Sequence, residues 1–134
     1  MKDKLFLETI VLMPIVHIIY ECESLVDSLN AANLLDFDEI NRFNLEIDYE
    51  IAALNGARFI VNRQGISERL LYETINTLQH LYSATTTITG AFRRKHPVPM
   101  IEHNLCHLIS IIRTICSDND LNYAWLRREV EENE

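Results

Sequence analysis

Residues 38–62 read DEINRFNLEIDYEIAALNGARFIVN, and the way this stretch folds decides the architecture of the protein. Its apolar residues recur at helical spacing and form one stripe made of Ile40, Phe43, Ile47, Ile51 and Leu54. Residues 43–51 also alternate with period two, and Asn55-Gly56 is a strong hairpin turn signal. Asp, Glu and Ala are depleted in strands, however, and a lone two-stranded hairpin is only marginally stable. We therefore predict a helix over 38–62, with a hairpin over 43–61 as the alternative.

Four further helices are predicted on either side of this stretch. They cover residues 3–29, 67–92 and 100–116, followed by a short C-terminal helix after residue 118. Pro14 should either kink the first helix or mark its true start. Three segments of about 25 residues and a shorter fourth, joined by short connections, suit an antiparallel bundle. The expected fold is therefore all-α, an antiparallel four-helix bundle with a short fifth C-terminal helix, in a single domain over 1–134.

Side chains that cap and anchor these helices can also be named. Asp36 or Asp38 is the expected N-cap of the helix over 38–62, and the third helix should open near Ser67. The last helix should be capped by one of three residues, Asp118, Asn119 or Asp120. Its apolar anchors should be Leu121, Trp125 and Leu126.

The first helix is apolar nearly all round between Ile10 and Ile19, which implies burial on several faces. The apolar run over residues 5–20 is shorter than the roughly 20 residues that cross a bilayer, and it contains Glu8, Pro14 and His17. We interpret it as a core helix, with no membrane role. Because a monomer of five helices could leave some of its faces uncovered, we also expect a homodimer.

The charge of the chain is uneven. Twelve basic and twenty acidic residues give a net charge of −8, which makes nucleic acid an improbable partner. Between Glu21 and Glu50 nine acids face one base, whereas residues 58–95 carry six bases and two acids. Oppositely charged helices could simply neutralise each other. Alternatively, the acids form a patch that attracts a basic protein partner. The candidate contact residues are Glu46, Asp48 and Glu50, together with the basic cluster Arg93, Arg94 and Lys95.

The three cysteines, Cys22, Cys106 and Cys116, lie in apolar stretches without zinc-binding spacing. Three buried, reduced thiols are typical of a cytoplasmic protein, and we expect that location.

One pair of residues has metal-ligand spacing. His103 and His107 are four residues apart, so they share one face of a helix, but the HExxH pattern of metalloproteases is absent. A third ligand would have to come from elsewhere in the fold. The acids also fail the paired ExxE and ExxD pattern of helical nucleotide pyrophosphohydrolases, and the Glu-x-x-His elements of di-iron bundles are missing.

We therefore expect a small, acidic, non-enzymatic binding or regulatory protein, without a cofactor, of the immunity, antitoxin, chaperone or inhibitor type. It would engage a protein partner, possibly a basic one, through an acidic helical face. The alternative is a metal-dependent hydrolase of a phosphorylated or nucleotide substrate, with His103 and His107 as metal ligands.

Overall fold

A computed structural model describes residues 3–31, 36–88 and 98–133, and over these ranges the chain is helical without any strand. The elements in chain order are a π-helical segment η1 (Phe6–Leu12), α1 (Met13–Asn30), α2 (Phe37–Gly56), α3 (Arg58–Arg63), α4 (Glu68–Thr86), α5 (Val98–Asp118) and α6 (Tyr123–Glu132). The predicted all-helical class is confirmed. The alternative hairpin over 43–61 is wrong.

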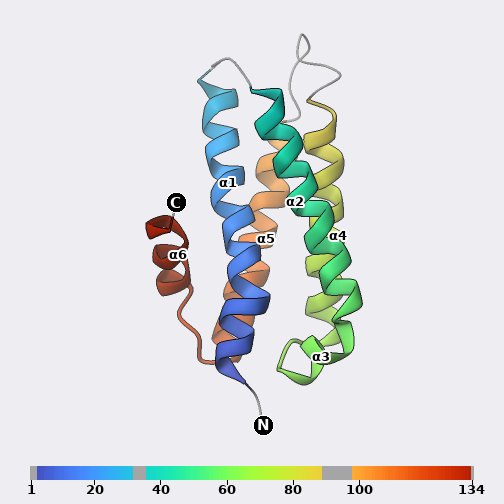
Figure 1. Ribbon diagram of the computed structural model, residues 1–134, viewed down its shortest axis with the longest axis vertical. Coiled ribbons are helices and arrows are strands. Elements are labelled where there is room, and N and C mark those ends of the chain that lie inside the picture. The colour runs from blue at the N-terminus through green and yellow to red at the C-terminus, as the bar shows by residue number, and fades with distance from the viewer. Residues whose placement is uncertain (1–2, 32–35, 89–97, 134) are drawn as a thin grey trace.

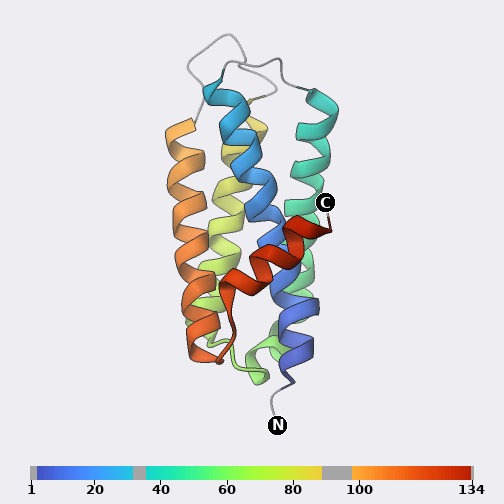
Figure 2. The same cartoon turned by 90° about the vertical axis from the view of Figure 1, so that its left-hand side faces the viewer.

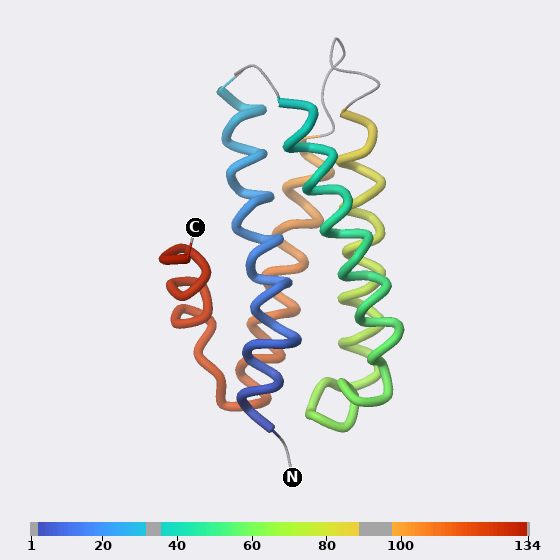
Figure 3. The backbone as a smooth tube through the Cα atoms, in the orientation of Figure 1, coloured from blue at the N-terminus to red at the C-terminus, as the bar shows by residue number. Residues whose placement is uncertain are grey.

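Four long helices lie side by side and successive ones run in opposite directions (Figures 1 and 3). Helix α1 contacts α2, α2 contacts α4, α4 contacts α5, and α5 returns to α1. Short α6 crosses α1 obliquely on the outside (Figure 2). These contacts are compatible with an antiparallel four-helix bundle. The pairing of α1 with α2 is the least extensive of the four, so this is the open side of the structure.

Pro14 does not interrupt the first helix but changes its winding. The chain is π-helical over η1, where the Met13 amide donates to the Glu8 carbonyl five residues back, and α-helical from Met13 onward. A proline ring clashes with the carbonyl four residues before it and offers no amide hydrogen. Pro14 directly follows this wider π turn as the second residue of α1, so the carbonyl that its ring would meet in a regular α-helix, that of Ile10, belongs to the π-helical segment.

The stretch that decides the fold is helical but is broken once. Asp36 caps α2 by accepting hydrogen bonds from the amides of Asp38 and Glu39, which confirms one of the two predicted caps. Ala57 separates α2 from α3, a short helix of six residues. The Asn-Gly step therefore loosens the end of a helix and does not reverse the chain.

Helix α4 begins as predicted, because Ser67 accepts a hydrogen bond from the Leu70 amide at 3.2 Å. It ends at Thr86, earlier than the predicted Phe92, which itself lies outside the described residues. The hydroxyls of Thr85, Thr86 and Thr87 donate to carbonyls three or four residues back. Such bonds compete with the helical ladder, as β-branched polar residues do at helix ends.

The connection between α5 and α6 corrects another prediction. Asn122 caps α6 by accepting from the Trp125 amide at 3.0 Å, in place of Asp118, Asn119 or Asp120. Asp120 adopts a positive φ of 54°, and the Leu121 amide donates to the Cys116 carbonyl at 2.8 Å. This closes the C-terminus of α5. Of the predicted anchors, Leu126 is fully buried, Leu121 is half-buried, and Trp125 is 37% exposed.

Helix α6 is held against α1 by an arginine. The Arg127 guanidinium pairs with Glu23 of α1 and Glu131 of α6, and it lies 5.6 Å from the centre of the Tyr20 ring. Together α2, α5 and α6 cover the apolar first helix within one chain. This removes the main reason for expecting a dimer, which stays a prediction.

Among the described residues one helix, Phe6–Asn30, is long and apolar enough to cross a membrane by length and composition. The core helix of a soluble protein meets the same criterion. One face of this helix is buried along its length and consists of Leu12, Ile15, Ile19, Cys22, Val26 and Leu29.

A buried polar pair joins α2 to α4. Thr85 is fully buried, and its hydroxyl lies within hydrogen-bond distance of the Asn44 side-chain carbonyl and of the Leu81 carbonyl, which share its single hydrogen. Thr85→Val should destabilise the protein by about 1–2 kcal/mol, because it deprives Asn44 of a buried donor. Urea unfolding measures this. The double variant Asn44→Leu/Thr85→Val should be less destabilised than the sum of the two single variants, whereas strict additivity would argue against coupling.

The expectation of three buried thiols is wrong for one of them. Cys22 and Cys116 are buried, and burial raises the pKa of Cys22 to about 12 and that of Cys116 to about 11, whereas Cys106 is exposed on α5. Since thiolates are the reactive form, one thiol per native chain should react quickly with Ellman's reagent. Cys106→Ser should abolish that fast phase, and a fast phase that survives the substitution would contradict this assignment.

Candidate functional site

A groove of about 930 Å³ lies between the first helix and α2. Most of its lining is apolar, and it contains acids but no Lys or Arg. The lining residues are Phe6, Thr9, Ile10, Val11, Pro14, His17, Ile18, Leu45, Glu46, Asp48, Tyr49, Glu50, Ala52, Ala53, Leu54, Ala57 and Val61. It lies along the least extensively packed pair of the long helices.

Large apolar side chains stand exposed at the mouth of this groove. Ile10 of η1 is 63% exposed, and Leu45 and Tyr49 of α2 are 67% and 75% exposed. Leu45 and Tyr49 are four residues apart and so share one face of the helix. Grouped exposed apolar residues with a polar rim are typical of interaction surfaces.

A second, more polar hollow continues along the same two helices. It has a volume of about 490 Å³ and meets the groove at Glu46, which lines both. Its acids are Glu21, Asp36, Glu39 and Glu46, and Arg42 is its one Lys or Arg. Six of the nine acids between Glu21 and Glu50 therefore line these two hollows.

The predicted acidic contact residues all line the groove, but in different environments. Asp48 is exposed, the Glu46 side chain is 41% exposed, and Glu50 is buried with 6% exposure. Within the described ranges no Lys or Arg forms an ion pair with any of the three. Over the described residues, the cross-helix ion-pair partner of these three acids is therefore His17, which contacts Glu46.

Glu50 occupies an unusual position for a carboxylate. It shares one face of α2 with the buried Ile47 and Leu54, and it lines the groove between α2 and the first helix. Burial raises the pKa of Glu50 to about 7, because the charged form loses its hydration there. The groove therefore holds a carboxyl group that is partly protonated near neutral pH.

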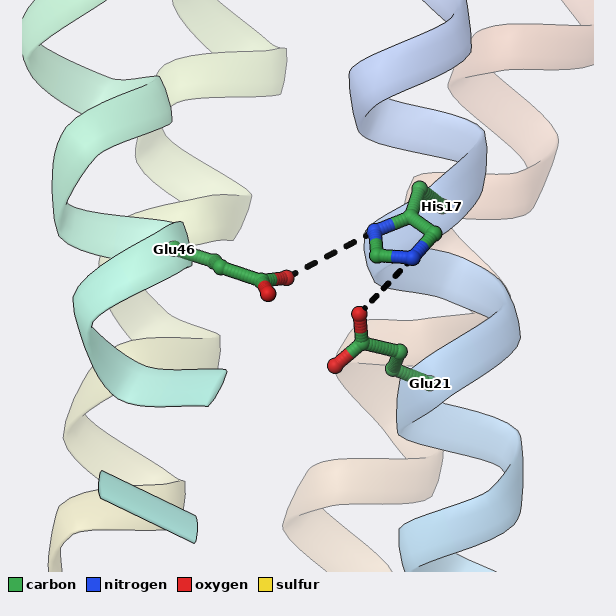
Figure 4. Close-up of side chains that lie close together, drawn as sticks. All are labelled: His17, Glu21 and Glu46. Atoms are coloured by element: carbon green, nitrogen blue, oxygen red, sulfur yellow. Dashed lines mark ion pairs between the residues drawn. The ribbon is translucent and has the colours of Figure 1, made fainter. Parts of the chain in front are cut away.

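A histidine lies between two glutamates where the groove meets the second hollow (Figure 4). His17 Nε2 is 2.9 Å from Glu21 Oε1 on the same helix, and its Nδ1 is 3.5 Å from Glu46 Oε2 on α2. One potential ligand atom from each of the three residues lies within 4.8 Å of the others. Where the structure describes the chain, this is the group whose geometry suits a metal ion.

The remaining predicted residues lie elsewhere. His103 and His107 are exposed on α5, and neither belongs to a group of three potential metal ligands among the described residues. Arg93, Arg94 and Lys95 lie outside the described residues. The acidic and the basic candidate contacts are therefore not assembled into one site by the part of the chain that is described.

Comparison of the chain with protein-family models, with curated proteins and with solved structures gives no match. Its function must therefore be argued from the geometry of this face.

Sequence reasoning named half of the site. It did not predict that Ile10, Leu45 and Tyr49 would be exposed on the surface. It also did not predict that His17 and Glu21 of α1 would lie close to Glu46 of α2. The signal that could have found the cluster is the four-residue spacing of His17 and Glu21, repeated by Glu46 and Glu50. Which helices face each other is decided only by the fold.

The buried carboxyl group makes stability depend on pH. The folded protein holds the Glu50 proton more tightly than the unfolded chain, where the group titrates near 4.5. The free energy of unfolding should therefore fall as pH rises from about 4.5 to about 7 and then level off, by at most about 3 kcal/mol. Glu50→Gln should be more stable than the wild type at about pH 8 and similar to it near pH 4.

Urea unfolding across this pH range measures the effect. Asp48→Asn is the matched control, since Asp48 is exposed on the same helix and should leave the profile unchanged. Parallel profiles for the wild type and Glu50→Gln would contradict the raised pKa.

Proposed function

We propose that this chain is a non-enzymatic binding protein whose groove between the first helix and α2 holds a basic, amphipathic helix of a protein partner. The observation that carries the proposal is the composition of the groove, which has exposed Ile10, Leu45 and Tyr49 at its mouth and acids without basic residues along its wall. An amphipathic helix fits an apolar groove through its apolar face. Lysines or arginines on its flanks would meet Asp48 and Glu46.

Charge complementarity favours a basic partner over a second copy of this chain. The chain has a net charge of −8, and a symmetric dimer through this face would place the same acids opposite one another. Acids lining a partly desolvated groove also attract a basic segment at long range, which raises its association rate at low salt. The homodimer expected from the sequence is therefore an alternative occupant of the groove.

The same proposal includes the finer architecture. We assign the four long helices to an antiparallel four-helix bundle with α6 added outside it. The ring of contacts from α1 through α2, α4 and α5 supports this assignment. In such a bundle, the α1–α2 side can act as a docking surface while the opposite pairs maintain the core.

A synthetic helix with leucines on one face and lysines on the other tests the groove. Titrated into the ¹⁵N-labelled, metal-free full chain, it should shift the amide resonances of η1, α1 and α2 before those of α4. Glu46→Gln/Asp48→Asn should weaken binding about fivefold at low salt, because each rim charge contributes roughly 0.5 kcal/mol. Leu45→Ser/Tyr49→Ser should weaken it at least about tenfold through the loss of apolar contact.

Two controls make this result specific. Asp118→Asn/Glu132→Gln removes two exposed acids that do not line the groove, and it should bind like the wild type. A matched peptide with glutamates in place of lysines should not bind. Equal weakening by both pairs of acid substitutions would reduce the effect to net charge. A dimer, measured by light scattering, that Leu45→Glu dissociates would show that a second copy occupies the groove.

A further inference from the structure

The His17 cluster joins two helices that have few other contacts. His17 and Glu21 are one helical turn apart on α1, and Glu46 and Glu50 repeat that spacing on α2. Figure 4 shows the imidazole pointing from α1 toward α2, with a glutamate at each ring nitrogen. Residues from both sides of the seam thus converge on one small region of the groove wall.

We propose that His17, Glu21 and Glu46 bind a divalent transition-metal ion, of which Zn²⁺ is the best match, across the α1–α2 seam. One imidazole nitrogen and two carboxylate oxygens make a ligand set that suits Zn²⁺ and its neighbours, whereas Mg²⁺ and Ca²⁺ favour oxygen ligands. Three protein ligands leave a fourth position for water, as in open zinc sites.

The three ligand atoms must move somewhat closer together to bind an ion. Ligands at about 2.0–2.2 Å from a tetrahedral ion are roughly 3.4 Å apart, and the present ligand atoms lie within 4.8 Å of one another. The two glutamates belong to different helices and are partly exposed, so their rotamers can close this difference. The imidazole must turn to offer one nitrogen to the ion, which leaves the other nitrogen free to donate a hydrogen bond.

Two further observations point to a cation. Glu46 Oε2 is buried and accepts no hydrogen bond within the described part of the chain, since its 3.5 Å separation from His17 Nδ1 is too long for one. Glu50, nine-tenths buried, lines the same groove as His17 and Glu46 and has no ion pair or hydrogen bond to another described residue. A buried carboxylate oxygen without a donor, such as Glu46 Oε2, is costly unless a cation satisfies it.

A bound ion would change the seam in two ways. It would connect α1 to α2 where their contacts are fewest, and it would neutralise the charge of Glu21 and Glu46. The metal site shares Glu46 with the proposed peptide groove, but the two tests can be told apart, because the peptide titration uses metal-free protein and its apolar variant changes only Leu45 and Tyr49. Failure of one proposal therefore leaves the other standing.

Calorimetric titration of Zn²⁺ into the untagged, chelator-treated full chain tests the site. The wild type should bind one ion per chain, and Zn²⁺ should raise its melting temperature. His17→Ala and Glu46→Gln should each weaken binding by at least about tenfold, as loss of a ligand does. Co²⁺ should give the visible d–d absorption of a low-symmetry site, and His17→Ala should abolish it.

His103→Ala/His107→Ala is the matched control, because it removes two exposed imidazoles at the same four-residue spacing on α5. It should leave Zn²⁺ binding unchanged. Absence of stoichiometric binding, or binding that survives His17→Ala and is lost in the α5 variant, overturns the proposal. Glu21→Gln, monitored by circular dichroism, provides a second test should His17→Ala fail to fold. Equal affinity for Zn²⁺ in the wild type and in Glu21→Gln would likewise overturn it.

Discussion

The structure depends on covering an N-terminal helix that is apolar on several sides. Leu12, Ile15 and Ile19 of this helix are essentially inaccessible to water, and burial of each such side chain is worth roughly 1.5–3 kcal/mol. No single neighbouring helix can cover all of its faces, so α2, α5 and α6 all pack against it. The short, outlying α6 is required for this reason, and Arg127 fixes it by pairing with Glu23 and stacking near Tyr20.

The groove exists because the helices do not pack equally closely against one another. Helices α4 and α5 pack extensively against their neighbours, whereas α1 and α2 meet along a seam that remains open as a groove. Three acids of α2, Glu46, Asp48 and Glu50, line this groove together with the exposed Leu45 and Tyr49. The same seam forces Glu50 into a poorly hydrated position and brings Glu46 to His17. A peptide groove and a cation site can therefore share one face, because both arise where the helices are separated.

Local sequence signals predicted the helices well and their ends less well. Apolar spacing found every long helix, and the caps Asp36 and Ser67 were recognisable because a short polar side chain bonds its own neighbouring amides. The π-helical turn before Pro14 was missed because several windings satisfy the same apolar pattern. The cap Asn122 was missed because Asp120 first takes a positive φ, which closes α5 and moves the start of α6 downstream.

The sequence by itself determined the all-helical class, the stripes that form the core and the concentration of acids between residues 21 and 50. These properties arise from contacts within one helical turn or from composition, so they can be predicted without knowing the tertiary structure. Only the tertiary structure decided that Glu50 is buried, that Cys106 is exposed and that His17 meets Glu46. Those outcomes depend on which helices are neighbours and on how they are aligned along their axes. Both are set by packing among residues far apart in the chain.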